Sequence, residues 1–105
     1  MKKLIRDDRV AVLVSQGFGA GWFTWHGVEA LLFDPKVIDM LESGQDGQDI
    51  VRYCETTYGA DSYYGGIDGL TVQWVPVGVR FYINEYDGSE VLVTEDDMAQ
   101  LWVTA

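Results

Sequence analysis

The sequence has few of the residues on which catalysis and covalent cross-links most often depend. It contains one cysteine, Cys54, and one histidine, His26, among 105 residues. A single cysteine excludes an intramolecular disulfide and a cysteine-based zinc site, and this usage favours a reducing cytoplasm. The longest aliphatic run, residues 10–14, is far too short to span a membrane. Asp7 and Asp8 stand where an export signal needs apolar residues, so we expect a cytoplasmic protein.

Basic side chains are also scarce. Seven Lys and Arg residues oppose 17 Asp and Glu residues, which gives a formal net charge of −10. The first nine positions hold four of the basic and two of the acidic side chains, so residues 10–105 carry 15 acidic and three basic ones, a net of −12. A body with this charge repels nucleic acid and anionic membranes and attracts a basic protein surface. We therefore expect no direct binding of nucleic acid or membrane.

The composition is otherwise that of a folded domain. Hydrophobic residues make up 48% of the chain, and the aromatic residues are spread along it. A chain of this length is one domain, residues 1–105, with room for a core but not for a separate catalytic lobe. Residues 1–8 are mostly polar, and we expect them to be mobile.

The stretch of residues 70–93 organises the predicted fold. It contains three apolar runs separated by two turn signals, Pro76-Val77-Gly78 and Tyr86-Asp87-Gly88. Both signals suit a three-residue hairpin loop closed by glycine, so the stretch predicts a three-stranded antiparallel meander. Residues 9–15, a short apolar run that ends at a glycine cluster, predict a further strand that could join the meander.

The register of the second hairpin decides which side chains share a face. A two-residue loop would place Glu85 opposite Glu90, and directly opposed like charges are destabilising. We therefore predict the three-residue loop, which pairs Glu85 with Ser89. Both faces of the meander are then apolar and must be covered, the second by the N-terminal and glycine-rich segments or by another copy of the chain in a homodimer. The first predicted face holds Val75, Val79, Phe81, Ile83, Val91 and Val93, and the second holds Leu70, Val72, Trp74, Tyr82 and Leu92.

Two helices are predicted between residues 35 and 58. Asp34-Pro35 has the form of an N-cap followed by proline at the first helical position, and Gly44 can end this helix. Residues 48–58 have apolar side chains at helical spacing, and Gly59 can end the second helix.

The fold class predicted from these elements is α+β. An antiparallel sheet of three to five strands carries the two helices on one face. Thr94 and Asp97 resemble a capping box, so residues 95–101 predict a further short helix. Residues 28–33 are ambiguous between a helical turn and a strand.

Residues 16–27, QGFGAGWFTWHG, combine four glycines with four aromatic residues. No regular period covers them, so we predict a loop that its aromatic side chains hold to the body. The loop lacks the glycine spacing of a dinucleotide site and the lysine of a P-loop, but its N–H groups could form a nest for an anion. The residues that could contact a small ligand or a peptide here are Gly17, Phe18, Gly19, Gly21, Trp22, Trp25 and His26.

Catalytic and metal-binding patterns are weak. His26 has no serine in nucleophile-elbow spacing, and we interpret it as a partly buried loop histidine bonded to backbone. Cys54 lies on the apolar side of a predicted helix and is interpreted as a core residue. Residues 42–53 do not match a calcium-binding loop. We therefore predict neither an enzyme nor a bound cofactor or metal.

Carboxylates are the one abundant candidate group. They either only keep the protein soluble or capture a basic surface, in the extreme case by imitating the phosphate spacing of nucleic acid, and the sequence leaves these interpretations open. The partner site that we predict is Glu95, Asp96 and Asp97. The wider acidic surface adds Asp34, Asp39, Glu42, Asp46, Asp49, Glu55 and Asp61 in the helical half, and Glu85, Asp87 and Glu90 near the second hairpin.

Three stretches resemble small uncharacterised proteins of tailed bacteriophages. They are VAVLVSQGFGAGW at residues 10–22, LLFDPKV at residues 31–37, and residues 74–90 from Trp-Val-Pro to Glu-Tyr-Asp-Gly-Ser-Glu. The resemblance carries no known activity, so it implies no catalytic or binding residue. It does imply a product made in the cytoplasm of an infected bacterium, where small acidic proteins often bind and divert host factors.

The function predicted from the sequence is a non-enzymatic acidic protein-binding module. As a phage product it would inhibit a basic host protein, such as a defence or nucleic-acid-handling factor. The alternative is a protein that binds or sequesters a small molecule, a nucleotide or a metabolite, through residues 16–27.

Overall fold

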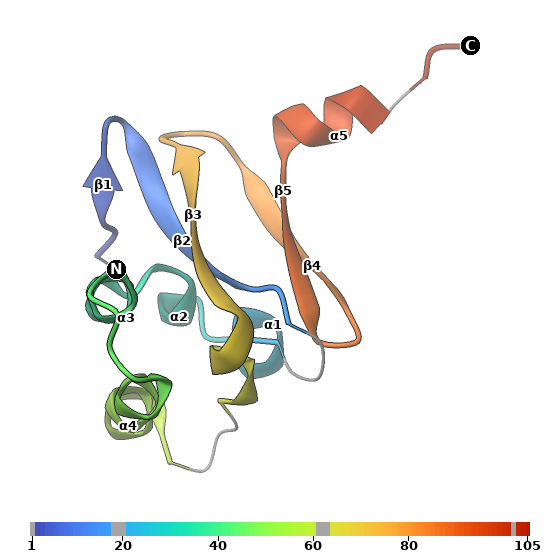
Figure 1. Cartoon of the computed structure of the whole chain (residues 1–105). Coiled ribbons are helices and arrows are strands. Elements are labelled where there is room, and N and C mark those ends of the chain that lie inside the picture. Colours follow the sequence, from blue (N-terminus) through green and yellow to red (C-terminus); the bar gives the residue numbers. More distant parts are fainter. Residues whose placement is uncertain (1, 18–20, 61–63, 102) are drawn as a thin grey trace.

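The chain folds into antiparallel strands and short helices, which confirms the predicted α+β class (Figure 1). The computed structural model describes residues 2–17, 21–60, 64–101 and 103–105. Its elements in chain order are β1 (Ile5–Arg6), β2 (Arg9–Ser15), α1 (Phe23–His26), α2 (Ala30–Phe33), α3 (Pro35–Glu42), α4 (Gly47–Tyr58), the 3-10 helix η1 (Gly65–Gly69), β3 (Leu70–Pro76), β4 (Phe81–Tyr86), β5 (Ser89–Thr94) and α5 (Glu95–Leu101). No helix in these ranges is both long and apolar enough to cross a membrane.

Strand β2 is the centre of the larger sheet, which has the order β1-β2-β3. β3 pairs with β2 along its whole length, from Pro76 opposite Arg9 to Leu70 opposite Ser15. β4 and β5 form a separate two-stranded sheet. The predicted meander is therefore wrong: a turn does form after Pro76, with Val79 N donating to Pro76 O, but β3 bonds to the N-terminal strand instead of to β4. The start of the chain, expected to be mobile, supplies β1.

The β4–β5 hairpin has a two-residue loop, Asp87-Gly88, in place of the predicted three-residue loop. Tyr86 lies opposite Ser89 and Glu85 lies opposite Glu90. The φ angles of the two loop residues are 50° and 84°, as a type I′ turn requires. The opposed carboxylates are tolerated because Glu90 is buried among hydrogen-bond donors, whereas Glu85 accepts a hydrogen bond from the turn.

The two central helices are confirmed. The Asp34 side chain accepts hydrogen bonds from the N–H groups of the first turn of α3, and Pro35 occupies the first helical position. Gly44 follows α3 with a φ of +73°. α4 begins after Asp46, whose carboxylate accepts from Gln48 N, and the helix ends at Tyr58, before Gly59.

The third predicted helix is also present as α5. Thr94 Oγ1 accepts from Asp97 N, and the Asp97 carboxylate accepts from Thr94 N, which is the reciprocal pattern of a capping box. The ambiguous residues 28–33 contain the helical turn α2. Residues 16–27 are not wholly irregular, because they include the one-turn helix α1.

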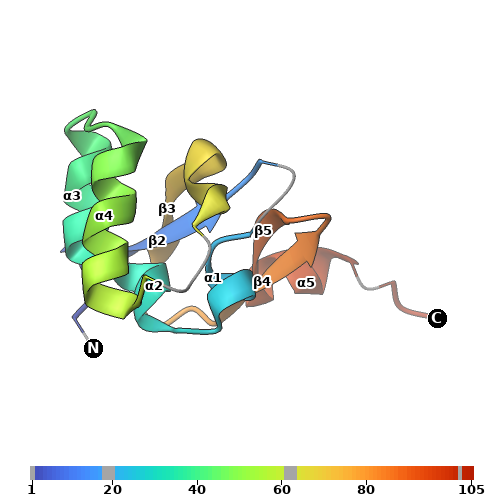
Figure 2. The same ribbon diagram turned by 90° about the horizontal axis from the view of Figure 1, so that it is seen from below.

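The side chains of β2 alternate between two cores. Ala11 and Leu13 point to the first core, which α3 and α4 cover, as predicted for the two helices. Val12 and Val14 point to the second core, where they meet α2 and the β4–β5 hairpin. Figure 2 shows α3 and α4 on one side of β2 and β3, and the hairpin on the other side. The larger sheet is therefore covered on both faces by the chain itself.

The hairpin itself has one covered face and one exposed face. Phe81, Ile83 and Leu92 pack on the second core, whereas Tyr82 and Val91 are exposed. The two-residue loop exchanges Leu92 and Val91 relative to the prediction, because a one-residue shift of register reverses the face of every side chain on β5. Both predicted faces are thus wrong in part.

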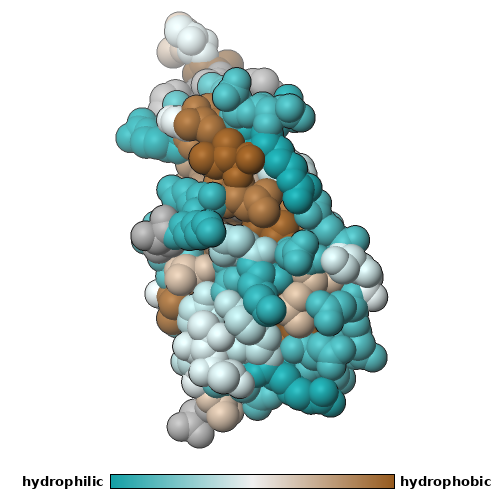
Figure 3. Space-filling model, turned by 90° about the vertical axis from the view of Figure 1, so that its left-hand side faces the viewer, coloured by the Kyte–Doolittle hydropathy of each residue, from teal (hydrophilic) through white to brown (hydrophobic). Residues whose placement is uncertain are grey.

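A second exposed apolar region lies near the β1–β2 turn. Figure 3 shows it on the upper part of the side that faces left in Figure 1. Ile5 of β1 and Val77 after β3 are both exposed, and Val77 N donates to Asp8 O, which brings the two turns together.

Candidate functional site

Glu90 of β5 holds the glycine-rich loop against the hairpin. Its side chain is 0% exposed. Oε1 accepts a hydrogen bond from Ser15 N at 3.0 Å, and Oε2 accepts from Trp22 N at 2.9 Å. Thr24 donates to Oε2 twice, from its backbone N at 2.9 Å and from Oγ1 at 2.7 Å. One carboxylate therefore connects the end of β2 and the start of α1 to the second sheet.

Two N–H groups of the loop that could form a nest for an anion, those of Trp22 and Thr24, are thus bound to a carboxylate of the protein itself. The local backbone must come close for this to happen. A Cβ atom on Gly21 would lie 2.3 Å from Thr24 Oγ1 and 3.1 Å from Glu90 Oε2. The sequence analysis placed Glu90 on the acidic surface, which is wrong because the side chain is buried. A two-residue turn at Asp87-Gly88 would have turned it inward.

The aromatic residues of the loop have different environments. Trp22 is buried in the first core and donates from Nε1 to Leu31 O, whereas Trp25 is exposed. The His26 ring stacks on Tyr64 with 4.7 Å between centroids. His26 Nδ1 lies 2.6 Å from Trp22 O, and because a carbonyl only accepts, Nδ1 carries the proton. His26 therefore bonds to backbone, as predicted.

Of the other predicted loop residues, Gly17 makes a close contact and two lie outside the part of the chain that the structure describes. Gly17 lies against Gly69, where a Cβ on Gly69 would be 2.3 Å from Gly17 N. Phe18 and Gly19 lie outside the described residues. The structure thus gives Gly17, Gly21 and Trp22 roles in packing, and the binding of a ligand by this loop stays a prediction.

Asp34 connects the two central helices. Its Oδ2 atom accepts hydrogen bonds from Tyr53 OH at 2.9 Å and from Tyr58 OH at 2.5 Å, while Oδ1 caps α3. Burial, with the bond to this carboxylate, raises the pKa of both tyrosines above their usual value. Burial also raises the pKa of the Cys54 thiol to about 12, so the thiolate that a nucleophile requires is disfavoured. Cys54 is a core residue, as predicted.

Most carboxylates of the predicted acidic surface have internal partners. Glu42 accepts a bidentate pair of bonds from Arg6 at 2.7 and 2.9 Å, and this bond lowers the pKa of Glu42. Arg52 pairs with Asp49 at 3.1 Å. Asp34, Asp46, Glu85 and Glu90 accept backbone N–H groups. Four residues of that surface have a carboxylate with neither a hydrogen bond nor an ion pair among the residues that the structure describes. They are Asp39, Glu55, Asp87 and Asp96.

The three acidic residues at the start of α5 also differ in whether their carboxylates have a partner. Glu95 pairs with Arg80 at 2.9 Å, and this hydrogen bond lowers the pKa of Glu95. Asp97 caps the helix, which leaves Asp96 exposed and unpaired. Figure 1 places α5 and α1 at opposite ends of the hairpin, so the structure does not bring these residues together with the glycine-rich loop.

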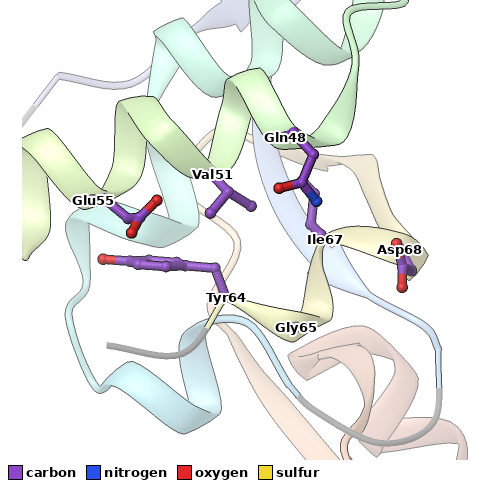
Figure 4. A pocket seen from close by; sticks show the side chains of 7 residues that line it. All are labelled: Gln48, Val51, Glu55, Tyr64, Gly65, Ile67 and Asp68. Atoms are coloured by element: carbon purple, nitrogen blue, oxygen red, sulfur yellow. The ribbon is translucent and has the colours of Figure 1, made fainter. Parts of the chain in front are cut away.

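Two unpaired carboxylates line a pocket between α4 and η1. The pocket has a volume of about 330 Å³. Glu55 of α4 and Asp68 of η1 lie at opposite ends of it, with Val51 and Ile67 between them and the Tyr64 ring beside Glu55 (Figure 4). Tyr64 is fixed by donating its hydroxyl to Gly59 O at 2.9 Å. The complete lining is Gln48, Val51, Glu55, Tyr64, Gly65, Ile67 and Asp68. Sequence reasoning assigned Glu55 to the acidic surface but missed Asp68.

The acidic pocket, as we call these seven residues, suits an organic cation. A lysine or arginine side chain that lies along the pocket has a cationic end for one of the two carboxylates and a methylene stem for Ile67 and Val51. In the described part of the chain, no three His, Cys, Asp or Glu side chains are placed to hold a metal ion. Comparison with protein-family models, with curated proteins and with solved structures found no match for this chain.

Proposed function

We propose that this protein is a non-enzymatic acidic module that binds a basic surface of a partner protein. The acidic pocket is the observation that carries the proposal. Glu55 and Asp68 have no internal ion pair, so a partner can use them without breaking the fold. The net charge of −10 would draw a basic partner toward the protein over a longer range.

The resemblance to phage proteins supports a host protein as the partner and its inhibition in the host cytoplasm as the result. In this proposal an arginine or lysine side chain of the partner enters the acidic pocket and anchors the complex. Asp96 at the start of α5 is free to add a second, exposed contact, whereas Glu95 and Asp97 are already engaged. Exposed contacts of this kind add to the rate of association more than to affinity.

The test is a titration with a short peptide that carries two arginines between glycines, followed by NMR of the protein backbone. The peptide with citrulline in place of arginine is the control for charge. We expect the arginine peptide to shift resonances of α4 and η1, and its affinity to fall as salt rises from about 0.05 to about 0.5 M.

Two pairs of substitutions with the same change of charge separate the pocket from net charge. Glu55→Gln with Asp68→Asn should weaken binding at least about tenfold, because the loss of even one charged hydrogen bond costs about 1.5 kcal/mol or more. Asp39→Asn with Asp87→Asn, away from the pocket, should weaken it about twofold at most. Equal losses in both pairs, or equal binding of the citrulline peptide, would reject the acidic pocket as the site.

A further inference from the structure

The two carboxylates of the acidic pocket are separated by apolar side chains. Glu55 lies at one end and Asp68 at the other, with Val51 and Ile67 between them (Figure 4). No basic side chain belongs to the lining, and neither carboxylate has a hydrogen bond or an ion pair in the part of the chain that the structure describes. Arg52, the basic residue of α4, pairs with an aspartate outside the pocket. Both ends of the pocket are therefore negative and can accept a cationic group.

The two walls of the pocket are held together at both ends, so the spacing of the carboxylates is set by the fold. At one end, the Tyr64 hydroxyl donates to Gly59 O at 2.9 Å, which joins the segment before η1 to the residue after α4. At the other end, Ile67 lies against Gly47, where a Cβ atom would be 3.2 Å from Ile67 Cγ1. Val51 and Ile67 also pack on the first core. A preformed pocket of this kind binds a ligand without the free-energy cost of ordering its walls.

The length of the pocket limits the ligands that can reach both ends. Gln48 and Glu55 of α4 are two helical turns apart, which is about 10 Å along the axis. Figure 4 shows Asp68 past Gln48, on the side away from Glu55. Two ammonium groups that each bond to one carboxylate at about 2.8 Å therefore need about 5–8 Å between them. An extended chain advances about 1.2 Å per bond, so a spacer of about four to six methylene groups fits.

We infer that the acidic pocket binds a free linear diamine, with one ammonium group on Glu55, the other on Asp68 and the methylene chain along Val51 and Ile67. This inference rests on the site of the proposed function and adds a small molecule as a second class of ligand. A continuous chain covers the apolar middle of the pocket, which two separate basic side chains of a partner would leave open. The net charge of −10 also attracts a dication more strongly than a monocation. A bound diamine competes with the basic side chain of the partner.

Backbone NMR titrations with 1,5-diaminopentane and with pentylamine, at constant ionic strength, compare two cationic ends with one. A symmetric diamine can present either end, which by itself raises its apparent affinity about twofold. We expect the diamine to bind at least about fivefold more tightly than pentylamine and to shift resonances of α4 and η1, because both carboxylates hold it at once. 1,3-Diaminopropane, which is too short for the pocket, should lose most of this advantage.

Single substitutions determine whether both ends of the diamine are bound at the same time. Glu55→Gln and Asp68→Asn should each reduce the affinity for the diamine to about that for pentylamine. Each should change the affinity for pentylamine about twofold at most, because the monoamine can use the remaining carboxylate. Asp39→Asn on α3, outside the pocket, is the control for net charge and should weaken diamine binding less than about twofold.

The arginine peptide described above distinguishes a failure of this inference from a failure of the proposed function. If the peptide binds but the diamine exceeds pentylamine only about twofold or less, the diamine site is overturned and the proposed function stands. If the diamine shows the expected gain and the peptide does not bind, the diamine site is supported and the proposed function is rejected. If neither shifts resonances of α4 and η1, both are rejected.

Discussion

Replacement of Glu90 by alanine should be the most destabilising single change in this protein. The substitution removes the acceptor of two buried backbone N–H groups, those of Ser15 and Trp22, and of the partly buried N–H group of Thr24. A buried donor without a partner costs about 1–3 kcal/mol. Water can enter the vacated space and relieve part of this cost, so we expect a loss of about 3–6 kcal/mol. A domain of this size is stable by about 5–15 kcal/mol in total.

The isosteric change Glu90→Gln should cost less, about 1.5–3 kcal/mol. A glutamine oxygen can still accept from Trp22 N and Thr24, but its NH₂ group then faces Ser15 N, and two donors cannot bond to each other. The matched control is Glu29→Ala, which removes an exposed glutamate that has no side-chain hydrogen bond and should change stability by about 0.5 kcal/mol at most.

Urea unfolding followed by tryptophan fluorescence measures these differences, because the buried Trp22 becomes exposed when the first core opens. The expected order of loss is Glu90→Ala, then Glu90→Gln, then Glu29→Ala. If Glu90→Ala lost less than about 1 kcal/mol, the carboxylate would not be what orders the loop, and the reasoning from unpaired donors would be refuted.

Two further changes test other contacts. Gly69→Ala should cost about 1–3 kcal/mol, because its Cβ would lie 2.3 Å from Gly17 N, whereas Gly17→Ala, with 3.5 Å to the nearest atom, should cost less than about 1 kcal/mol. Equal losses in thermal unfolding would contradict the close approach. Burial and the bond to Asp34 raise the pKa of Tyr58, so the unfolded state loses this proton first as pH rises above about 10, and stability should fall there. Tyr58→Phe should be less stable at neutral pH by about 1.5 kcal/mol but should lose less between about pH 9.5 and 11.5; parallel curves in urea titrations would count against this linkage.

The parts of the fold that the sequence predicted correctly depend on neighbouring residues. Asp34 and Pro35 define the start of α3 by bonds and angles within one turn, and Thr94 with Asp97 define the start of α5 in the same way. These signals need no knowledge of the rest of the molecule, because the partners are at most a few residues apart.

The incorrect parts depend on distant residues. β3 has an apolar pattern that suits either β2 or β4 as a partner, and only the packing of the whole chain selects β2. The register of the hairpin failed for a related reason. The repulsion between Glu85 and Glu90 was judged as if both were in water, but Glu90 is buried among donors from residues 15, 22 and 24. The sequence predicted an acidic surface but not which of its carboxylates are free. Glu42, Asp49 and Glu95 pair with arginines, and this pairing depends on tertiary contacts or on side-chain rotamers.

The buried carboxylate of β5 also has a consequence for the order of events during synthesis. Glu90 reaches Ser15 and Trp22, which precede it by 75 and 68 positions. In a growing chain the N–H groups of Ser15 and Trp22 therefore have no carboxylate to accept their hydrogen bonds until Glu90 has left the ribosome. A product cut short before this glutamate would carry an unfinished core with Trp22 open to water, which is a ready substrate for cellular proteases.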